Sequence, residues 1–381
     1  MNIAFFCIPA HGHTNPTLAV VRELTARGHT VRYYTTEAFR AKVEAAGAVF
    51  VPFDTEAARP GMTAADGARL GSDLAFSTKL IVDLTLAADD WLSRELTVHR
   101  PDVIVGDSMA FWAKLAAKKH GIPFVSSTTT FAFNRFSAKV IEQNGAGFLQ
   151  FLLAQPRINR QLKRLRAAGY AVKSVFDIIA NDNETETVVY TSPDFQPCAD
   201  TFSEKYHFVG PLLRPAQSSF EKLPGRSLIY ISLGTVNNDA LPFYRACLAA
   251  FGGDPRFQLV LSAGTQTDLA AFGPIPESCT VRASVDQMAV LDCADVFLTH
   301  CGMNSASEGL WHGLPLVLYP QTPEQHGVAN RVAALGAGVP LTDPSADGIR
   351  RAVETALTDP SYRENAQKLA GGFRRCGGAA E

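Results

Sequence analysis

Residues 296–325, VFLTHCGMNSASEGLWHGLPLVLYPQTPEQ, contain the pattern that decides the fold. The pattern predicts a buried strand over residues 295–299, a tight polar turn, a helix, and a second apolar strand over residues 315–319. Glycines at 302 and 309 bracket the start of the helix, and small polar residues occupy its first turn. Such a turn presents backbone N–H groups and the positive end of the helix dipole, so an anion fits there and a diphosphate fits best.

The same residues also allow an interpretation without a ligand. Ser305-Ala306-Ser307-Glu308 has the spacing of a capping box, in which Ser305 caps the helix and Glu308 bonds back to its start. This stretch alone leaves both interpretations open.

The composition limits the classes of protein to be considered. A chain of 381 residues suggests two or three domains, and a hydrophobic share of 46% is enough for large cores. The formal net charge is −2 and there is no basic run, which argues against a nucleic acid partner. No apolar run has the length of a membrane span, and because the chain enters an apolar strand at residue 2 we expect no signal peptide. The seven cysteines include no C-x-x-C pair, so we expect a reduced, cytoplasmic location.

Apolar runs predict an α/β protein with two series of strands and helices between most of them. In the first series the predicted strands are 2–8, 29–35, 48–53, 101–107, 123–129, 187–192 and 206–210. In the second they are 227–232, 257–262, 279–283, 295–299, 315–319 and 338–342. A stretch rich in proline separates the two series. We therefore predict domains over 1–210 and 226–358, a linker over 211–225, and a C-terminal segment over 359–381 that packs back on the first domain.

The loop after the first strand carries no dinucleotide-binding fingerprint. It reads Pro9-Ala10-His11-Gly12-His13, without G-x-G-x-x-G, which counts against an NAD-dependent oxidoreductase. Asn15 and Pro16 predict the N-cap and first residue of the next helix, which places His13 in the loop.

Three motifs together resemble those of family 1 glycosyltransferases, in the group that acts on macrolides and other natural products. The longest is the 296–325 stretch quoted above, and the others are PAHGHTNP (9–16) and VIVGD (103–107). The resemblance implies the glycosyltransferase B fold, in which two Rossmann-like doubly wound domains face a cleft. It also implies that His13 is the catalytic base and that Asp107 orients it, which suits a neutral imidazole near pH 7.

The resemblance further implies a site for a nucleotide sugar in the second domain. The turn Ser232-Leu233-Gly234-Thr235 would touch the donor phosphates, Glu308 the ribose and Glu324 the sugar. The implied donor-binding residues are Thr235, Val285, Gln287, His300, Gly302, Asn304, Ser305, Glu308, Glu324 and Gln325. Because the helix dipole and hydrogen bonds would stabilise the charge on the leaving group, we expect that neither a metal nor a cofactor is needed.

One departure from the family concerns the nucleobase. Relatives often place a Trp before x-Pro-Gln to stack on the base, whereas this chain has Ser284. Phe272 and Arg282 are candidates to cover the base in its place.

The substrates are expected from the same resemblance and from the aromatic residues of the first half. Phe111, Phe131, Phe133, Phe136 and Phe148 are expected to line an apolar acceptor pocket. The expected reaction is an inverting transfer of a hexose, from UDP-glucose, to a hydroxyl of a lipophilic natural product such as a polyketide, macrolide or flavonoid. A dTDP-deoxysugar donor remains open, and so does the choice between monomer and homodimer.

Two other classes of function remain to be weighed. His11 and His13 form H-x-H, which suits a metal-dependent hydrolase, although no other pair of histidines in the chain adds ligands. A sugar-nucleotide epimerase, or a binding protein without transferase activity, could share the two-domain architecture.

Overall fold

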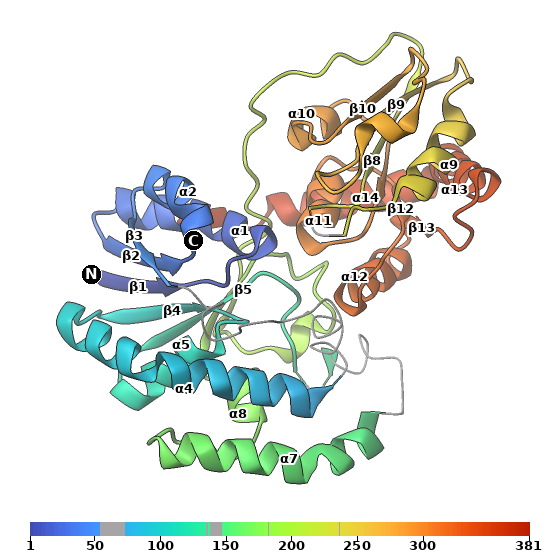
Figure 1. The fold of residues 1–381 in the computed structure, drawn as a ribbon. Helices are drawn as coiled ribbons and strands as arrows, with labels where there is room; N and C mark the ends of the chain where they lie inside the picture. Colours follow the sequence, from blue (N-terminus) through green and yellow to red (C-terminus); the bar gives the residue numbers. More distant parts are fainter. Residues whose placement is uncertain (54–72, 135, 138–146, 182, 236) are drawn as a thin grey trace. The chain divides into compact units, whose positions relative to one another are not determined.

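The computed structural model describes residues 1–53, 73–134, 136–137, 147–181, 183–235 and 237–381, without the side chains of 147–153. The chain folds as two compact units (Figure 1). The first unit contains Met1–Tyr190, Gln196–Leu212 and Gly378–Glu381, and the second contains Thr191–Phe195 and Leu213–Gly377.

The described part of the first unit holds a seven-stranded parallel sheet with the order β3-β2-β1-β4-β5-β6-β7. The chain order reverses between β1 and β4, which is the switch point of a doubly wound sheet. The strands are β1 (Asn2–Phe6), β2 (Thr30–Thr35), β3 (Val49–Pro52), β4 (Val103–Asp107), β5 (Phe124–Thr128), β6 (Glu186–Val189) and β7 (Tyr206–Phe208). The helices are α1 (His11–Ala26), α2 (Arg40–Ala45), α4 (Leu74–His99), α5 (Phe111–His120), α7 (Gly147–Ala167) and α8 (Phe176–Ile179).

Alternating side chains of β1 fill two separate cores, one on each face of the sheet. Phe5 packs with Leu18 and Val21 of α1, and it stacks on Tyr33 with ring centroids 4.9 Å apart. Phe6 packs on the opposite face with residues of α4 and α5, among them Trp112. Because both faces are covered by helices, the strand reads as a continuous apolar run in the sequence.

The second unit repeats this topology with a six-stranded parallel sheet, ordered β10-β9-β8-β11-β12-β13 in its described residues. Its strands are β8 (Ser227–Ser232), β9 (Phe257–Ser262), β10 (Cys279–Arg282), β11 (Val296–Thr299), β12 (Leu316–Leu318) and β13 (Gly338–Pro340). Its helices are α9 (Leu241–Phe251), α10 (Gln287–Leu291), α11 (Met303–Trp311), α12 (Pro323–Ala334), α13 (Ala346–Thr358) and α14 (Pro360–Arg374).

Every predicted strand is present, most of them one or two residues shorter than the apolar run. The sequence misplaced the start of one helix and missed another. The first helix begins at His11, so Asn15 is not its N-cap and Pro16 lies inside it. Helix α7 was not predicted, and it packs along α4 (Figure 1). In the C-terminal segment, α14 packs on α11 within the second unit, and only Gly378–Glu381 join the first unit.

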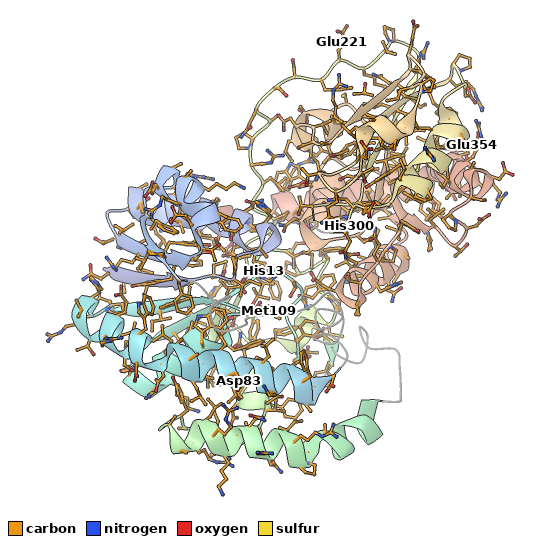
Figure 2. The ribbon with its side chains drawn as sticks, viewed as in Figure 1. His13, Asp83, Met109, Glu221, His300 and Glu354 are labelled. Carbon is orange, nitrogen blue, oxygen red and sulfur yellow. The ribbon has the colours of Figure 1, made fainter. Side chains whose placement is uncertain are left out.

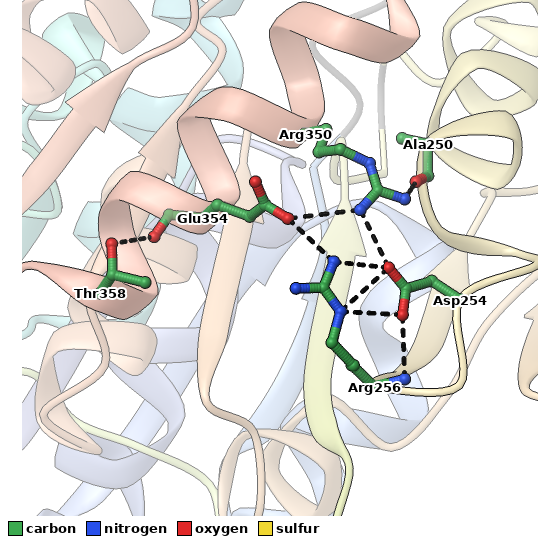
Figure 3. A network of polar contacts seen from close by, with 6 residues as sticks. All are labelled: Ala250, Asp254, Arg256, Arg350, Glu354 and Thr358. Atoms are coloured by element: carbon green, nitrogen blue, oxygen red, sulfur yellow. Dashed lines mark hydrogen bonds and ion pairs between the residues drawn. The ribbon is translucent and has the colours of Figure 1, made fainter.

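A network of ion pairs joins the turn before β9 to α13 in the second unit (Figure 3). Asp254 lies 2.7 Å from Arg256 Nη2 and 3.0 Å from Arg350 Nη1, and both arginines also contact Glu354. The Arg256 guanidinium beside Asp254 holds the pKa of that carboxyl well below its usual range. Since all four side chains remain partly accessible to solvent, the network contributes modestly to stability.

In the described part of the chain, none of the helices combines the length and the apolar character that crossing a membrane requires.

Candidate active site

His13 and Asp107 meet at the switch point of the first sheet. His13 follows β1 and Asp107 is the last residue of the neighbouring β4. The Nδ1 of His13 lies 2.7 Å from Oδ2 of Asp107, and the side chain of Asp107 is fully buried. Ligands of doubly wound sheets bind at this position, beyond the carboxyl ends of the strands.

His13 belongs to the first turn of α1, not to a loop as predicted. The helix begins at His11 after Ala10, whose side chain makes no capping bond. Backbone N–H groups of His13 and Thr14 both donate to the carbonyl of Ala10, at 3.0 and 2.8 Å. The helix therefore fixes the backbone of His13 as firmly as the strand fixes that of Asp107.

Further hydrogen bonds hold the pair in place. The second carboxylate oxygen of Asp107, Oδ1, accepts the backbone N–H of Met109 at 2.8 Å. Thr129, directly after β5, places its Oγ1 2.9 Å from Nδ1 of His13. With a carboxylate at Nδ1, the proton of a neutral imidazole resides on that nitrogen and Nε2 carries the lone pair. Such a histidine can take a proton from a hydroxyl at Nε2.

Sequence reasoning missed Thr129. Its position at the end of a predicted strand, on the same edge of the sheet as Asp107, was the available signal.

A cavity of about 100 Å³ lies beside Asp107 within the first unit. Its apolar lining includes three of the predicted acceptor residues, Phe111, Phe131 and Phe133. Hydroxyl groups of β5 and the following loop contribute polar atoms to the same wall. Phe136 is exposed and does not line the cavity, and the side chain of Phe148 lies outside the described residues. Figure 2 marks Met109, which lines this cavity, together with His13.

The second sheet has an equivalent switch point between β8 and β11. The turn after β8 contains Gly234, and His300 follows β11. A Cβ atom added to Gly234 or to Gly302 would lie 2.6 Å from Nε2 of His300. The imidazole therefore occupies space that only glycine leaves open on both sides. Burial lowers the pKa of His300 to about 4, so the ring is neutral at pH 7.

Helix α11 begins directly after His300 and a strained turn. Cys301 has a φ of +64°, in the left-handed region that residues with a Cβ rarely adopt. The N-cap is Gly302, which offers no side chain to the amides of Met303, Asn304 and Ser305. The first helical bond runs from Ala306 N–H to Gly302 carbonyl oxygen, at 2.9 Å.

The capping-box interpretation is therefore wrong, because Ser305 is the third residue of the helix and not its N-cap. Half-buried Asn304 and Ser305 lie in the first turn, where an anion would interact with the helix dipole. Gly309 lies in the helix interior, where an added Cβ would be 2.8 Å from the Phe297 ring, so glycine lets α11 pack closely on the sheet.

Glu308 is held by a neighbour from another helix. Gln287, the first residue of α10, donates from Nε2 to Oε2 of Glu308. Burial raises the pKa of Glu308, and the Gln287 donor and the charge of Arg214 oppose that rise. The other end of the Gln287 amide is also bonded, since the hydroxyl of Tyr230 donates to its Oε1 at 2.9 Å. Sequence reasoning missed Tyr230, because nothing in a β-strand pattern distinguishes this tyrosine from a core residue.

The segment that carries Ser284 and Val285 follows β10, and one proposed substitute for the missing tryptophan, Phe272, is not available to it. Phe272 is buried in the core and packs against Tyr244. The guanidinium of Arg282 donates to the carbonyl of Val281 at 3.3 Å. Ser284 itself is exposed and Val285 is half-buried.

The next residue, Asp286, is the N-cap residue of α10 and anchors the stretch that enters the second unit. It accepts backbone N–H bonds from Gln217 and Ser218, at 2.6 and 2.9 Å.

Glu324 and Gln325 lie at the start of α12. Gln325 forms a capping box with Thr322, since Thr322 Oγ1 accepts the Gln325 N–H and Gln325 Oε1 accepts the Thr322 N–H. This bonding provides a structural explanation for Gln325 that needs no sugar. Glu324 and the turn residue Thr235 are both exposed.

His11 does not share the environment of His13. Its ring contacts Phe39 edge-on, and its Nδ1 lies 3.4 Å from the ammonium group of Lys42. Burial lowers the pKa of His11, and the charge of Lys42 lowers it further. No group of three or more His, Cys, Asp or Glu side chains is placed to hold a metal ion in the described part of the chain.

Part of the second unit and the chain as a whole are both similar to known proteins. Residues 281–372 match the family model described as UDP-glucoronosyl and UDP-glucosyl transferase. The chain is 33% identical to the NDP-glycosyltransferase YjiC of Bacillus licheniformis, over 99% of this chain and 95% of that protein. It is 32% identical to the demethyllactenocin mycarosyltransferase of Streptomyces fradiae, over 100% of this chain and 84% of that protein.

Among solved structures, the chain resembles the glycosyltransferase of kitacinnamycin with a TM-score of 0.84 and 30% identity. That similarity covers 100% of this chain and 96% of the other. The predicted fold class is confirmed, and the hydrolase and epimerase alternatives are set aside. The chain thus belongs to the family 1 glycosyltransferases of the natural-product and macrolide group, and it is a hexosyltransferase with the glycosyltransferase B fold.

Proposed function

We propose that the protein is an inverting, metal-independent transferase that moves glucose from UDP-glucose to a hydroxyl group of a small lipophilic natural product. Candidate acceptors are polyketides, macrolides and flavonoids. The observation that carries the proposal is the 2.7 Å contact between His13 Nδ1 and Asp107 Oδ2, which leaves Nε2 as the basic nitrogen.

On the acceptor side, His13 takes the proton of the attacking hydroxyl as the new C–O bond forms. The charge of Asp107 stabilises the imidazolium that results. The apolar lining of the cavity beside Asp107, with Phe111, Phe131 and Phe133, favours a flat or lipophilic acceptor.

On the donor side, the start of α11 binds the diphosphate and Glu308 binds the ribose. Glu308 lies six residues after Gly302, and a rise of about 1.5 Å per residue puts about 9 Å of helix between them. This separation suits a diphosphate and the ribose attached to it. Hydrogen bonds and the helix dipole stabilise the charge that develops on the leaving UDP, which makes a metal ion unnecessary.

The reaction is a single displacement at the anomeric carbon. The acceptor oxygen forms its bond as the bond to the diphosphate oxygen breaks, and the proton goes to His13. One displacement inverts the anomeric configuration, and no covalent sugar–enzyme intermediate forms.

The test is a screen of hydroxylated aromatic and macrocyclic acceptors with UDP-glucose, read by mass, in buffer containing EDTA. We expect a product heavier by one hexose, with the anomeric configuration inverted by NMR. Transfer that stops with EDTA and returns with Mg²⁺ would overturn metal independence. Retention of configuration would overturn the role of His13, and transfer from dTDP-glucose but not UDP-glucose would overturn the donor.

A further inference from the structure

Three side chains from three elements of the second unit are linked in series by hydrogen bonds. Tyr230 in β8 donates to Oε1 of Gln287 at 2.9 Å, and Gln287 donates from Nε2 to Oε2 of Glu308 in α11. An amide has one accepting and one donating end. The bond from Tyr230 therefore fixes which end of Gln287 faces the carboxylate.

The hydroxyl of Tyr230 has a fixed position. The side chain is 1% exposed, and its ring stacks on Phe297 with centroids 4.8 Å apart and an interplanar angle of 18°. A buried hydroxyl that lost this bond would leave the accepting end of Gln287 without its donor. The orientation of Gln287 is thus set by the core of the unit and does not depend on a nucleotide.

The consequence concerns the number of donors that Glu308 requires from a nucleotide. Ribose offers two neighbouring hydroxyls, whereas 2′-deoxyribose offers one. A buried carboxylate with an unpaired oxygen is unfavourable, but Oε2 of Glu308 already accepts from Gln287. When the 2′-hydroxyl is absent, the carboxylate of Glu308 therefore keeps the hydrogen bond from Gln287. Without Gln287 it would lose that bond as well.

We propose that Gln287, positioned by Tyr230, sets how strongly the site discriminates ribose from 2′-deoxyribose in nucleoside diphosphate donors. Gln287 does so by keeping one oxygen of Glu308 hydrogen-bonded when the 2′-hydroxyl is absent. This inference rests on the assignment of Glu308 to the ribose in the proposed function.

In the described part of the second unit, four ionisable groups lie beside the elements that carry Gln287 and Glu308. Arg214, from the segment that enters the second unit, acts on Glu308 and lies 3.8 Å from Asp286, the N-cap residue of α10. His312, the C-cap residue of α11, lies 3.2 Å from Asp292. None of the variants below changes these four groups.

The decisive experiment compares the affinities of UDP and 2′-deoxy-UDP by calorimetry. We expect wild type to prefer UDP by less than about tenfold, and Gln287→Leu to increase that preference by about tenfold. Tyr230→Phe should change the preference in the same direction and by less. Tyr244→Phe is the matched control, because its hydroxyl is also buried in this unit and makes no hydrogen bond among the described residues.

The pH dependence of UDP binding separates positioning from a general structural effect. UDP affinity should fall as the pH falls, because protonated Glu308 accepts hydrogen bonds less well. Gln287 stabilises the ionised form of Glu308. The midpoint of this fall should therefore move to higher pH in Gln287→Leu, and less far in Tyr230→Phe. General loosening of the unit would weaken both nucleotides equally and leave the midpoint in place.

An unchanged UDP to 2′-deoxy-UDP ratio in folded Gln287→Leu would overturn the inference and leave the proposed function intact. If Gln287→Leu does not fold, the comparison of Tyr230→Phe with Tyr244→Phe decides, and equal ratios in those two overturn it. Absence of UDP binding to wild type would overturn the inference together with the proposed donor.

Discussion

The imidazole of His13 and the carboxylate of Asp107 are 94 positions apart in the chain and 2.7 Å apart in the structure. Helix α1 supplies one and strand β4 the other, since α1 begins and β4 ends at the same edge of the first sheet. A buried carboxylate at Nδ1 selects the tautomer whose Nε2 can accept a proton.

His13→Ala should remove nearly all transfer and leave the affinity for UDP almost unchanged. General-base catalysis typically contributes ~10²–10⁴ to the rate, and His13 belongs to the first unit whereas the phosphate turn belongs to the second. The measurement is turnover with a poorly acidic alcohol, with UDP affinity by calorimetry. His11→Ala is the matched control and should keep the wild-type rate. Wild-type turnover in His13→Ala would show that another group is the base.

Asp107→Asn should lower turnover by roughly 10²–10⁴ with little change in acceptor or donor affinity. The asparagine can still accept the Met109 N–H, but its amide would turn an N–H toward Nδ1 and favour the tautomer protonated at Nε2. Steady-state kinetics separates an effect on turnover (kcat) from an effect on acceptor or donor binding (KM). A change in KM with an unchanged kcat would mean that Asp107 serves binding and not the base.

Gly302→Ala should weaken UDP binding, because its methyl group would meet Nε2 of His300 at 2.6 Å. Gly234→Ala meets the same atom and adds backbone strain, since its φ is +80°. It should therefore lose ~1–2 kcal/mol of stability in addition. Gly225→Ala is the control for strain alone, with a φ of +73° and open space around its Cβ. Equal UDP affinity in all three variants would contradict the placement of His300 at the donor site.

The burial of His300 predicts that acid destabilises the second unit. Its pKa is about 4 in the folded state and near 6.5 when unfolded, so the unfolded state binds the extra proton as the pH falls below 6.5. Between pH 7 and pH 4.5 this difference removes roughly 2–3 kcal/mol of stability. Denaturant titrations of wild type and His300→Asn measure it, with the exposed His326→Asn as control. Equal losses in all three proteins would assign the acid sensitivity to other groups.

Ser284→Trp tests whether the base lies over the segment after β10. Ser284 is exposed, and Phe272 is buried in the core of the second unit. A tryptophan should therefore stack on the base and tighten UDP binding by ~1–3 kcal/mol. Calorimetry with UDP is the measurement, and ribose 5-phosphate, which has no base, is the control ligand. An unchanged UDP affinity would place the base elsewhere.

The strands could be predicted from the sequence, because buried parallel strands produce apolar runs such as SLIYIS and FQLVLS. Both runs match β8 and β9 residue for residue. Helix α7 was missed although Ile158, Leu162 and Leu165 are buried at helical spacing, and it contains Pro156, a residue that normally argues against a helix interior.

The sites were predictable where strand ends bring residues together, as for His13 with Asp107. The supporting hydroxyls of Thr129 and Tyr230 could not be predicted. Each bonds to a residue that is remote in sequence, and a sequence pattern does not give that distance. The left-handed backbone conformation of Cys301 could not be predicted either, since glycine is the residue normally expected in that conformation.

The bounds of the two units have a consequence for dissecting the enzyme, because the chain passes from one unit to the other four times. Arg331 of α12 bonds to the carbonyls of Phe195 and Asp194, at 2.8 and 3.0 Å, although both precede most of the second unit. Gly378 likewise donates to Val209 at 3.0 Å, within the first unit. A chimera joined only in the 211–225 stretch would therefore take residues 191–195 from one parent and the rest of the second unit from the other. It would likewise separate residues 378–381 from the rest of the first unit. Exchange of acceptor and donor halves between relatives should move 191–195 and 378–381 with the units to which they belong.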